Sequence, residues 1–93
     1  MTADIAASTR PALGRGFRLQ WEPAQNAHVL LYPEGMVKLN ASAGEIMKRC
    51  DGQRTITEIV ADLEAAFAAS GLTGDVNAFV SLALARKWLE VRE

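Results

Sequence analysis

The residue types that most often carry out catalysis are scarce in this sequence. His28 is the only histidine and Cys50 the only cysteine, and neither has a nucleophile, base or orienting carboxylate at a recognisable spacing. His28 falls at the start of an expected strand. Cys50 falls on the apolar face of an expected helix near its C-terminal end, where burial and the helix dipole both raise the pKa of a thiol. We expect both side chains to be structural and the protein not to be an enzyme.

The remaining polar residues indicate no metal, phosphate or cofactor site. Zinc needs paired cysteine or histidine ligands, and calcium needs an alternating set of oxygen ligands, whereas the acidic residues here are scattered. Gly14-Arg15-Gly16 precedes an expected strand rather than a helix, so it lacks the arrangement of a phosphate-binding loop. The prediction is a protein that needs no metal ion or cofactor and acts by binding.

Length and composition place the chain among ordinary small globular domains. Its 93 residues suffice for one domain, and 49% apolar with 23% charged residues argue against global disorder. The net charge of −1 gives no general attraction to nucleic acid or to anionic membranes. A single cysteine fits a reducing compartment, and neither a run of about 18 apolar residues nor a secretory signal is visible. We expect a soluble, cytoplasmic protein.

Residues 17–40 have the pattern of three short strands. Between Phe17 and Glu22 apolar and polar residues alternate, which is typical of a half-buried strand. Residues 29–32 form a continuous apolar run of strand length. Pro33-Glu34-Gly35 has the composition of a tight turn, and the segment from Met36 to Asn40 completes a third strand. Tight connections between the three strands predict an antiparallel meander.

Beyond residue 40 the apolar period changes from that of a strand to that of a helix. Ser42 and Glu45, and again Thr55 and Glu58, have the spacing of a capping box, which marks the start of a helix. Glycines, which favour helix ends, follow the first two apolar stripes. The expected helices run from Ser42 to Asp51-Gly52, from Thr55 to Ser70-Gly71, and from near Asp75 to about Trp88.

The predicted fold class is therefore α+β, with a three-stranded antiparallel sheet followed by three helices in a winged-helix-like order. Residues 1–14 are small and polar, with Pro11 and Gly14 near their end, and we expect a flexible tail there. Residues 15–93 are expected to form one domain.

The third predicted helix is apolar around about two thirds of its circumference, which is more than one face of one sheet requires. Two explanations stay open: the sheet and the other helices enclose this helix, or part of its apolar surface lines a groove for a partner. The strand Met36–Asn40 comes last in the meander, so one of its edges can be free. A free edge beside an apolar helix suits strand addition by a peptide. Lys38 and the shortness of the strand are the features that would blunt this edge.

A set of short motifs runs through the chain between residues 10 and 91. The motifs are Arg10-Pro11, Leu13, Gly16, Arg18-Leu19, Leu30-Leu31-Tyr32-Pro33-Glu34-Gly35, Leu39-Asn40, Ala43, Cys50-Asp51-Gly52, Arg54-Thr55, Glu58-Ile59-Val60 and Asp75-Val76 to Phe79. In this combination they resemble the family of pyrroloquinoline quinone (PQQ) biosynthesis protein D, a peptide-recognition domain of modified-peptide biosynthesis.

The resemblance implies a peptide chaperone that binds the short precursor peptide of the PQQ cofactor and presents it to a radical S-adenosylmethionine enzyme. It also implies that the peptide adds as a strand beside the third strand and packs against the third helix. A monomer or weak homodimer is expected. The peptide-binding residues that the resemblance implies are Met36, Val37, Lys38, Leu39, Asn40, Val76, Phe79, Val80 and Ala83.

Two other functions are weighed against this one. The first is a structural interaction module that positions the enzyme without binding free peptide. The second is a winged-helix DNA-binding domain, which needs basic residues at the start of its recognition helix and on its wing. Here the third helix begins with Asp75 and the hairpin tip carries Glu34, so DNA binding is disfavoured.

Overall fold

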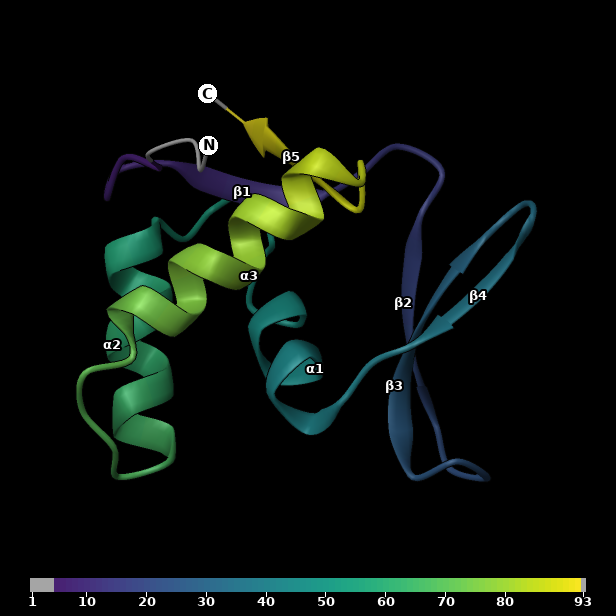
Figure 1. Cartoon of the computed structure of the whole chain (residues 1–93), viewed down its shortest axis with the longest axis horizontal. Coiled ribbons are helices and arrows are strands. Elements are labelled where there is room, and N and C mark those ends of the chain that lie inside the picture. The colour runs from purple at the N-terminus through teal and green to yellow at the C-terminus, as the bar shows by residue number, and fades with distance from the viewer. Residues whose placement is uncertain (1–4, 93) are drawn as a thin grey trace.

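The computed structural model describes residues 5–92 of the chain (Figure 1). It confirms the predicted α+β order, a three-stranded antiparallel sheet followed by three helices, and it adds a small second sheet. The elements in chain order are strands β1 (Arg10–Leu13), β2 (Arg18–Glu22), β3 (Ala27–Tyr32) and β4 (Gly35–Lys38), helices α1 (Ala41–Met47), α2 (Ile56–Ala66) and α3 (Thr73–Ala85), and strand β5 (Leu89–Arg92).

Strands β2, β3 and β4 form the expected meander, although β4 spans Gly35–Lys38 rather than the predicted Met36–Asn40. Leu19, Leu30 and Val37 stand opposite one another in register, and since side chains alternate between the two faces of a sheet, they share the face that packs on the helices. Leu30 is completely buried there. Pro33 and Glu34 form a two-residue connection between β3 and β4, as their turn chemistry predicts.

The capping residues decide where the first two helices begin. Thr55 and Glu58 make the predicted capping box at the start of α2, each side chain accepting from the backbone N–H of the other residue. The corresponding prediction for Ser42 is wrong. The side chain of Asn40 caps α1 instead, accepting from the N–H of Ala43 at 2.7 Å, so the helix begins at residue 41 and Ser42 lies within its first turn.

The limits of all three helices differ from the expected ones. Helix α1 ends at residue 47, before the predicted Asp51-Gly52. Helix α2 ends at residue 66, before the predicted Ser70-Gly71, because Ala68 already adopts a left-handed backbone with φ of 50°. Helix α3 begins at residue 73 rather than at Asp75 and ends at residue 85 rather than at Trp88. Lys87, with φ of 68°, turns the chain out of the helix and into β5.

The predicted flexible tail over residues 1–14 is wrong where it includes β1. Pro11 and Ala12 are buried, and β1 pairs with β5 in an antiparallel register from Arg10 opposite Arg92 to Leu13 opposite Leu89. Local composition does not reveal this pairing, because the partner strand lies at the other end of the chain. Residues 1–4 of that tail lie outside the described residues, as does residue 93.

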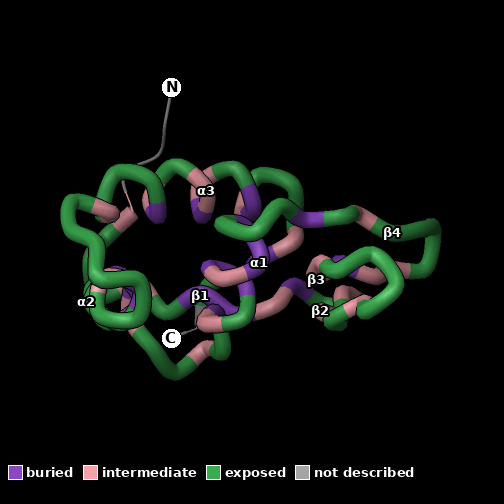
Figure 2. Tube along the Cα trace, turned by 90° about the horizontal axis from the view of Figure 1, so that it is seen from below, coloured by how far each residue is buried: buried purple, intermediate pink, exposed green. Residues whose placement is uncertain are grey.

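The core lies between the three helices, the β1–β5 sheet and the inner face of the β2–β4 sheet. Figure 2 shows buried positions on the sides of α1, α3 and β1 that face one another, while the β2–β4 sheet extends to one side. Ile59, Val80 and Ala83 have no exposed surface.

Arg49 lies where α1 meets α2 and donates to the carboxylates of Glu45 and Asp62, which fixes the two helices relative to one another. Within the described part of the chain, no helix is both long and apolar enough to cross a bilayer.

Candidate functional site

Cys50 and His28, the two candidate catalytic side chains in the sequence, both pack against neighbouring residues. Cys50 is 4% exposed and its Sγ donates to the carbonyl oxygen of Ile46 at 3.2 Å. Burial, together with the nearby charge of Asp51, raises the pKa of this thiol to about 12, so it is a poor nucleophile. His28 is partly buried, and its ring makes a T-shaped contact with that of Trp21, with centroids 5.1 Å apart. The prediction that Cys50 is a buried packing residue is confirmed. In residues 5–92, no three acidic, histidine or cysteine side chains gather as a metal site.

A hollow lies between β4 and α3, beside the strand edge that the sequence predicted to be free. It has a volume of about 390 Å³ and lies between the end of β4 and the start of α1 on one side and α3 with Trp88, the residue before β5, on the other. We call this hollow the β4–α3 groove. Its lining residues are Val37, Lys38, Leu39, Asn40, Ser42, Ala43, Ile46, Asp75, Phe79, Leu82 and Trp88.

One side of the groove is a strand edge with free backbone groups. The sheet order is β2-β3-β4, and no strand within residues 5–92 pairs with the outer side of β4. The N–H of Leu39 donates to the carbonyl of His28 on β3 at 3.0 Å. Because backbone groups alternate in direction along an antiparallel strand, Val37 also faces β3, whereas Met36 and Lys38 direct their N–H and C=O groups to the open edge.

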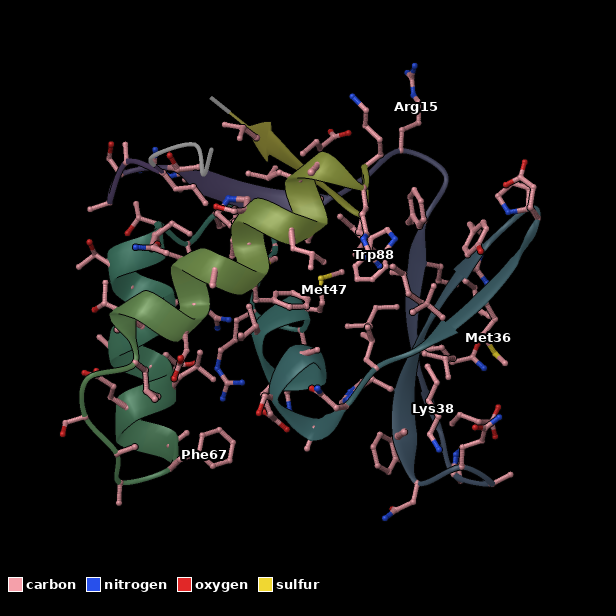
Figure 3. All side chains as sticks on the ribbon, in the orientation of Figure 1. Arg15, Met36, Lys38, Met47, Phe67 and Trp88 are labelled. Atoms are coloured by element: carbon pink, nitrogen blue, oxygen red, sulfur yellow. The ribbon has the colours of Figure 1, made fainter. Side chains whose placement is uncertain are left out.

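The opposite side of the groove is an apolar wall. Phe79 and Trp88 lie with ring centroids 6.5 Å apart, and Figure 3 shows Trp88 between the end of α3 and the sheet. The guanidinium of Arg86 stands 5.3 Å from the centre of the Trp88 ring, a cation–π contact that holds the indole in place. Leu82, one turn beyond Phe79, is 42% exposed. A groove of this kind presents backbone hydrogen bonds on one side and apolar contacts on the other.

The residues predicted for peptide binding fall into three groups. Val37, Lys38, Leu39, Asn40 and Phe79 line the groove. Met36 does not line it, but stands on the same edge of β4 with half of its surface exposed, its side chain directed away from the helices (Figure 3). The third group is buried, with at most 1% of its surface exposed, and does not line the groove: Val76, Val80 and Ala83.

Sequence reasoning missed several lining residues, of which Leu82 and Trp88 are the largest. The spacing of Leu82, three residues after Phe79, was a usable signal, since residues three apart share a face of a helix. Trp88 gave no such signal. It reaches the groove only because the chain leaves α3 at Lys87 in a left-handed conformation, which helical periodicity does not predict.

Comparison with known proteins identifies relatives of the whole fold. The family model of coenzyme PQQ synthesis protein D (PqqD) matches residues 27–89. A "PqqA binding protein" of Stutzerimonas stutzeri is 52% identical over 91 residues, covering 97% of this chain and 99% of the relative. One of the same name from Azotobacter vinelandii is 57% identical over 82 residues, covering 87% and 89%.

A solved structure resembles this fold over nearly its full length. It is the solution structure of the PqqD truncation of Methylobacterium extorquens PqqCD, described as a functional and stand-alone recognition element for ribosomally synthesized and post-translationally modified peptides. The TM-score is 0.78 at 30% identity, with 96% of each chain covered. The sequence match and the shared fold agree with the motifs seen in the sequence, and the chain belongs to the PqqD family.

Proposed function

We propose that this chain is a non-catalytic adaptor of PQQ biosynthesis, which binds the PqqA precursor peptide by strand addition and presents it to a radical S-adenosylmethionine enzyme. The observation that carries the proposal is the free edge of β4 beside the apolar wall of Phe79, Leu82 and Trp88. The names of the relatives support the identity of the peptide.

The geometry of β4 sets how the peptide binds. Met36 and Lys38 supply the outward backbone donors and acceptors, so a peptide strand forms its ladder with these two residues. Side chains of the added strand alternate in direction. Every second one then faces the groove and contacts Phe79, Leu82 or Trp88. Backbone bonds give affinity in this mode, and the apolar wall gives specificity.

The role of the adaptor is to position a flexible substrate. Holding the peptide on a rigid edge removes part of the entropy cost of its encounter with the enzyme. If the same domain also binds the enzyme, the tethered peptide experiences a high effective concentration, on the order of millimolar for a short connection. Cys50, whose thiol pKa is about 12, takes no part in the chemistry.

A matched pair of substitutions at residue 38 tests the edge. Proline is tolerated on an edge strand where its nitrogen faces outward, so Lys38→Pro removes one donor to the peptide and leaves the β3–β4 ladder intact. Lys38→Ala removes the charge but keeps the donor. Titration of isotope-labelled protein with PqqA peptide should show about tenfold weaker binding for the proline variant than for the alanine variant. Equal affinities for the two variants would show that the peptide does not use this edge.

The same titration separates the proposal from its rivals. Wild-type protein should shift the amide signals of residues 36–40 and of Phe79 and Leu82 as peptide is added. An absence of shifts at saturating peptide, combined with tight binding to the enzyme, would instead identify a module that only positions the enzyme. Sedimentation with and without peptide reports the oligomeric state, since an empty edge of β4 can pair with a second copy. We expect a monomer or weak homodimer that peptide dissociates.

A further inference from the structure

A second hollow lies beside the β4–α3 groove, lined by residues of the three helices and of the connection between α2 and α3. Its volume is about 330 Å³. Leu63 and Val76 are buried in its apolar floor. Phe67 stands at its rim with 54% of its surface exposed, and Figure 3 shows the ring projecting from the end of α2 toward α1. We call this hollow the helix pocket. An aromatic side chain at the rim of an apolar hollow is typical of a binding surface.

The helix pocket and the β4–α3 groove share a border. Ser42, Ile46 and Asp75 line both hollows. The border lies at the end of β4, since Ser42 is only two residues beyond Asn40. A peptide that pairs with β4 and continues past Asn40 can therefore pass from the groove to the helix pocket along these three shared residues.

The border carries a carboxylate that is free to bind a cation. The side chain of Asp75 is exposed and has no hydrogen-bond or ion-pair partner among residues 5–92. Glu45, on the opposite side of the helix pocket, differs in this respect, because Arg49 and Lys48 already neutralise it. A lysine or arginine side chain of a ligand could therefore pair with Asp75, whereas Glu45 is already paired with Arg49 and Lys48.

We propose that the helix pocket is a second subsite for the same peptide. It takes one large apolar side chain from the part of the peptide that continues past β4, with a basic side chain of the peptide beside Asp75. This inference rests on the proposed function. Its occupant follows from the continuity of the two hollows, from the apolar floor and from the unpaired carboxylate at the border.

The test compares affinities for PqqA peptide among variants of the full chain. Phe67→Ala removes the rim, and Ala69→Trp fills the pocket from an exposed lining position. Each should weaken peptide binding about tenfold. The matched controls are Val91→Ala and Ala61→Trp, which change exposed residues outside both hollows and should bind as the wild type does. Asp75→Asn should weaken binding and reduce its dependence on salt concentration.

The outcomes separate this inference from the proposed function. If Phe67→Ala and Ala69→Trp bind peptide as the wild type does while Lys38→Pro binds it weakly, the helix pocket is not a peptide subsite and the edge of β4 remains the site. If the wild type does not bind the peptide, both proposals fall. If the two pocket variants bind peptide normally but no longer self-associate or no longer bind the enzyme, the pocket is the binding site for that second copy or for the enzyme. Either result would overturn the inference. Weaker peptide binding by both pocket variants, with folded proteins and unchanged controls, supports it.

Discussion

The backbone N–H of Gly14 donates to the carbonyl oxygen of Trp88 at 2.8 Å. At the same place, a β-carbon on residue 14 would stand 2.1 Å from the carbonyl oxygen of Lys87. Only glycine permits so close an approach without a shift of one of the two backbones. Since Trp88 lines the β4–α3 groove, this contact connects the N-terminal strand to the site.

We predict that Gly14→Ala destabilises the protein by about 1–3 kcal/mol, because the added methyl group forces β1 away from the turn after α3. The free energy of unfolding in urea measures this effect. Gly74→Ala is the control, since a β-carbon there meets nothing within 4 Å, and it should change stability by about 1 kcal/mol or less. The Gly14 variant should also bind peptide more weakly because Trp88 moves. Equal stabilities of the two variants would contradict the close contact.

A second prediction concerns acid stability. The hydrogen bonds from Arg49 hold the pKa of Glu45 and that of Asp62 below their ordinary values. A carboxyl group whose pKa is lower in the folded state stabilises the fold above its unfolded pKa, and this contribution is lost as the pH falls. The free energy of unfolding should therefore decrease below about pH 5. Both carboxylates are partly exposed, so the effect is modest.

Arg49→Met tests the source of this dependence. The variant keeps an apolar stem at a side chain that is only 11% exposed and removes the guanidinium. Its free energy of unfolding should change less between about pH 5 and pH 3 than that of the wild type. Lys48→Met is the matched control, because Lys48 is 48% exposed and is a weaker partner of Glu45. An identical pH profile for wild type and Arg49→Met would refute the assignment.

Cys50 should resist thiol reagents in the folded protein. Its Sγ is buried and its pKa is about 12, so almost no thiolate is present at pH 8. We expect modification by a disulfide reagent to follow the rate of unfolding and to become fast in concentrated guanidinium chloride. Rapid reaction of the native protein at pH 8 would mean that α1 opens locally to expose the thiol.

Leu82 is predicted to contribute to peptide affinity without contributing much to stability. Its side chain is 42% exposed in the free protein and would be covered by a peptide in the groove. Leu82→Ala should weaken binding of PqqA peptide by about three- to tenfold, measured by calorimetric titration. Trp21→Ala, at a similarly exposed residue that does not line the groove, should leave affinity unchanged. A larger effect at Trp21 than at Leu82 would place the peptide elsewhere.

The features that sequence predicted well depend on neighbouring residues. Three local sequence patterns each predicted a feature that the structure contains. They are the alternation that begins at Phe17, the turn at Pro33-Glu34 and the capping box of Thr55 with Glu58. The N-cap of α1 was misplaced by two residues because Asn40 and Ser42 are both good capping residues and local sequence does not decide between them.

The features that sequence did not predict depend on distant contacts. β1 exists because β5 pairs with it across the length of the chain. Helical periodicity identified α3 as unusually apolar, but it could not tell which apolar residues the core covers. Val80 and Ala83 are completely buried, whereas Leu82 between them is not. The free edge of β4 could be predicted because it follows from the order of the strands. The apolar wall of the β4–α3 groove could not, because it depends on how α3 and Trp88 pack.

The pairing of β1 with β5 brings residues 10 and 92 opposite one another, and Figure 1 shows both ends of the described chain on the same side of the molecule. A domain fused before β1 or after β5 would thus be attached at nearly the same point. The length of the linker, rather than the choice of end, would set how far the fused domain reaches across the surface toward β4. Fusion proteins built in either order should leave the β4–α3 groove equally accessible.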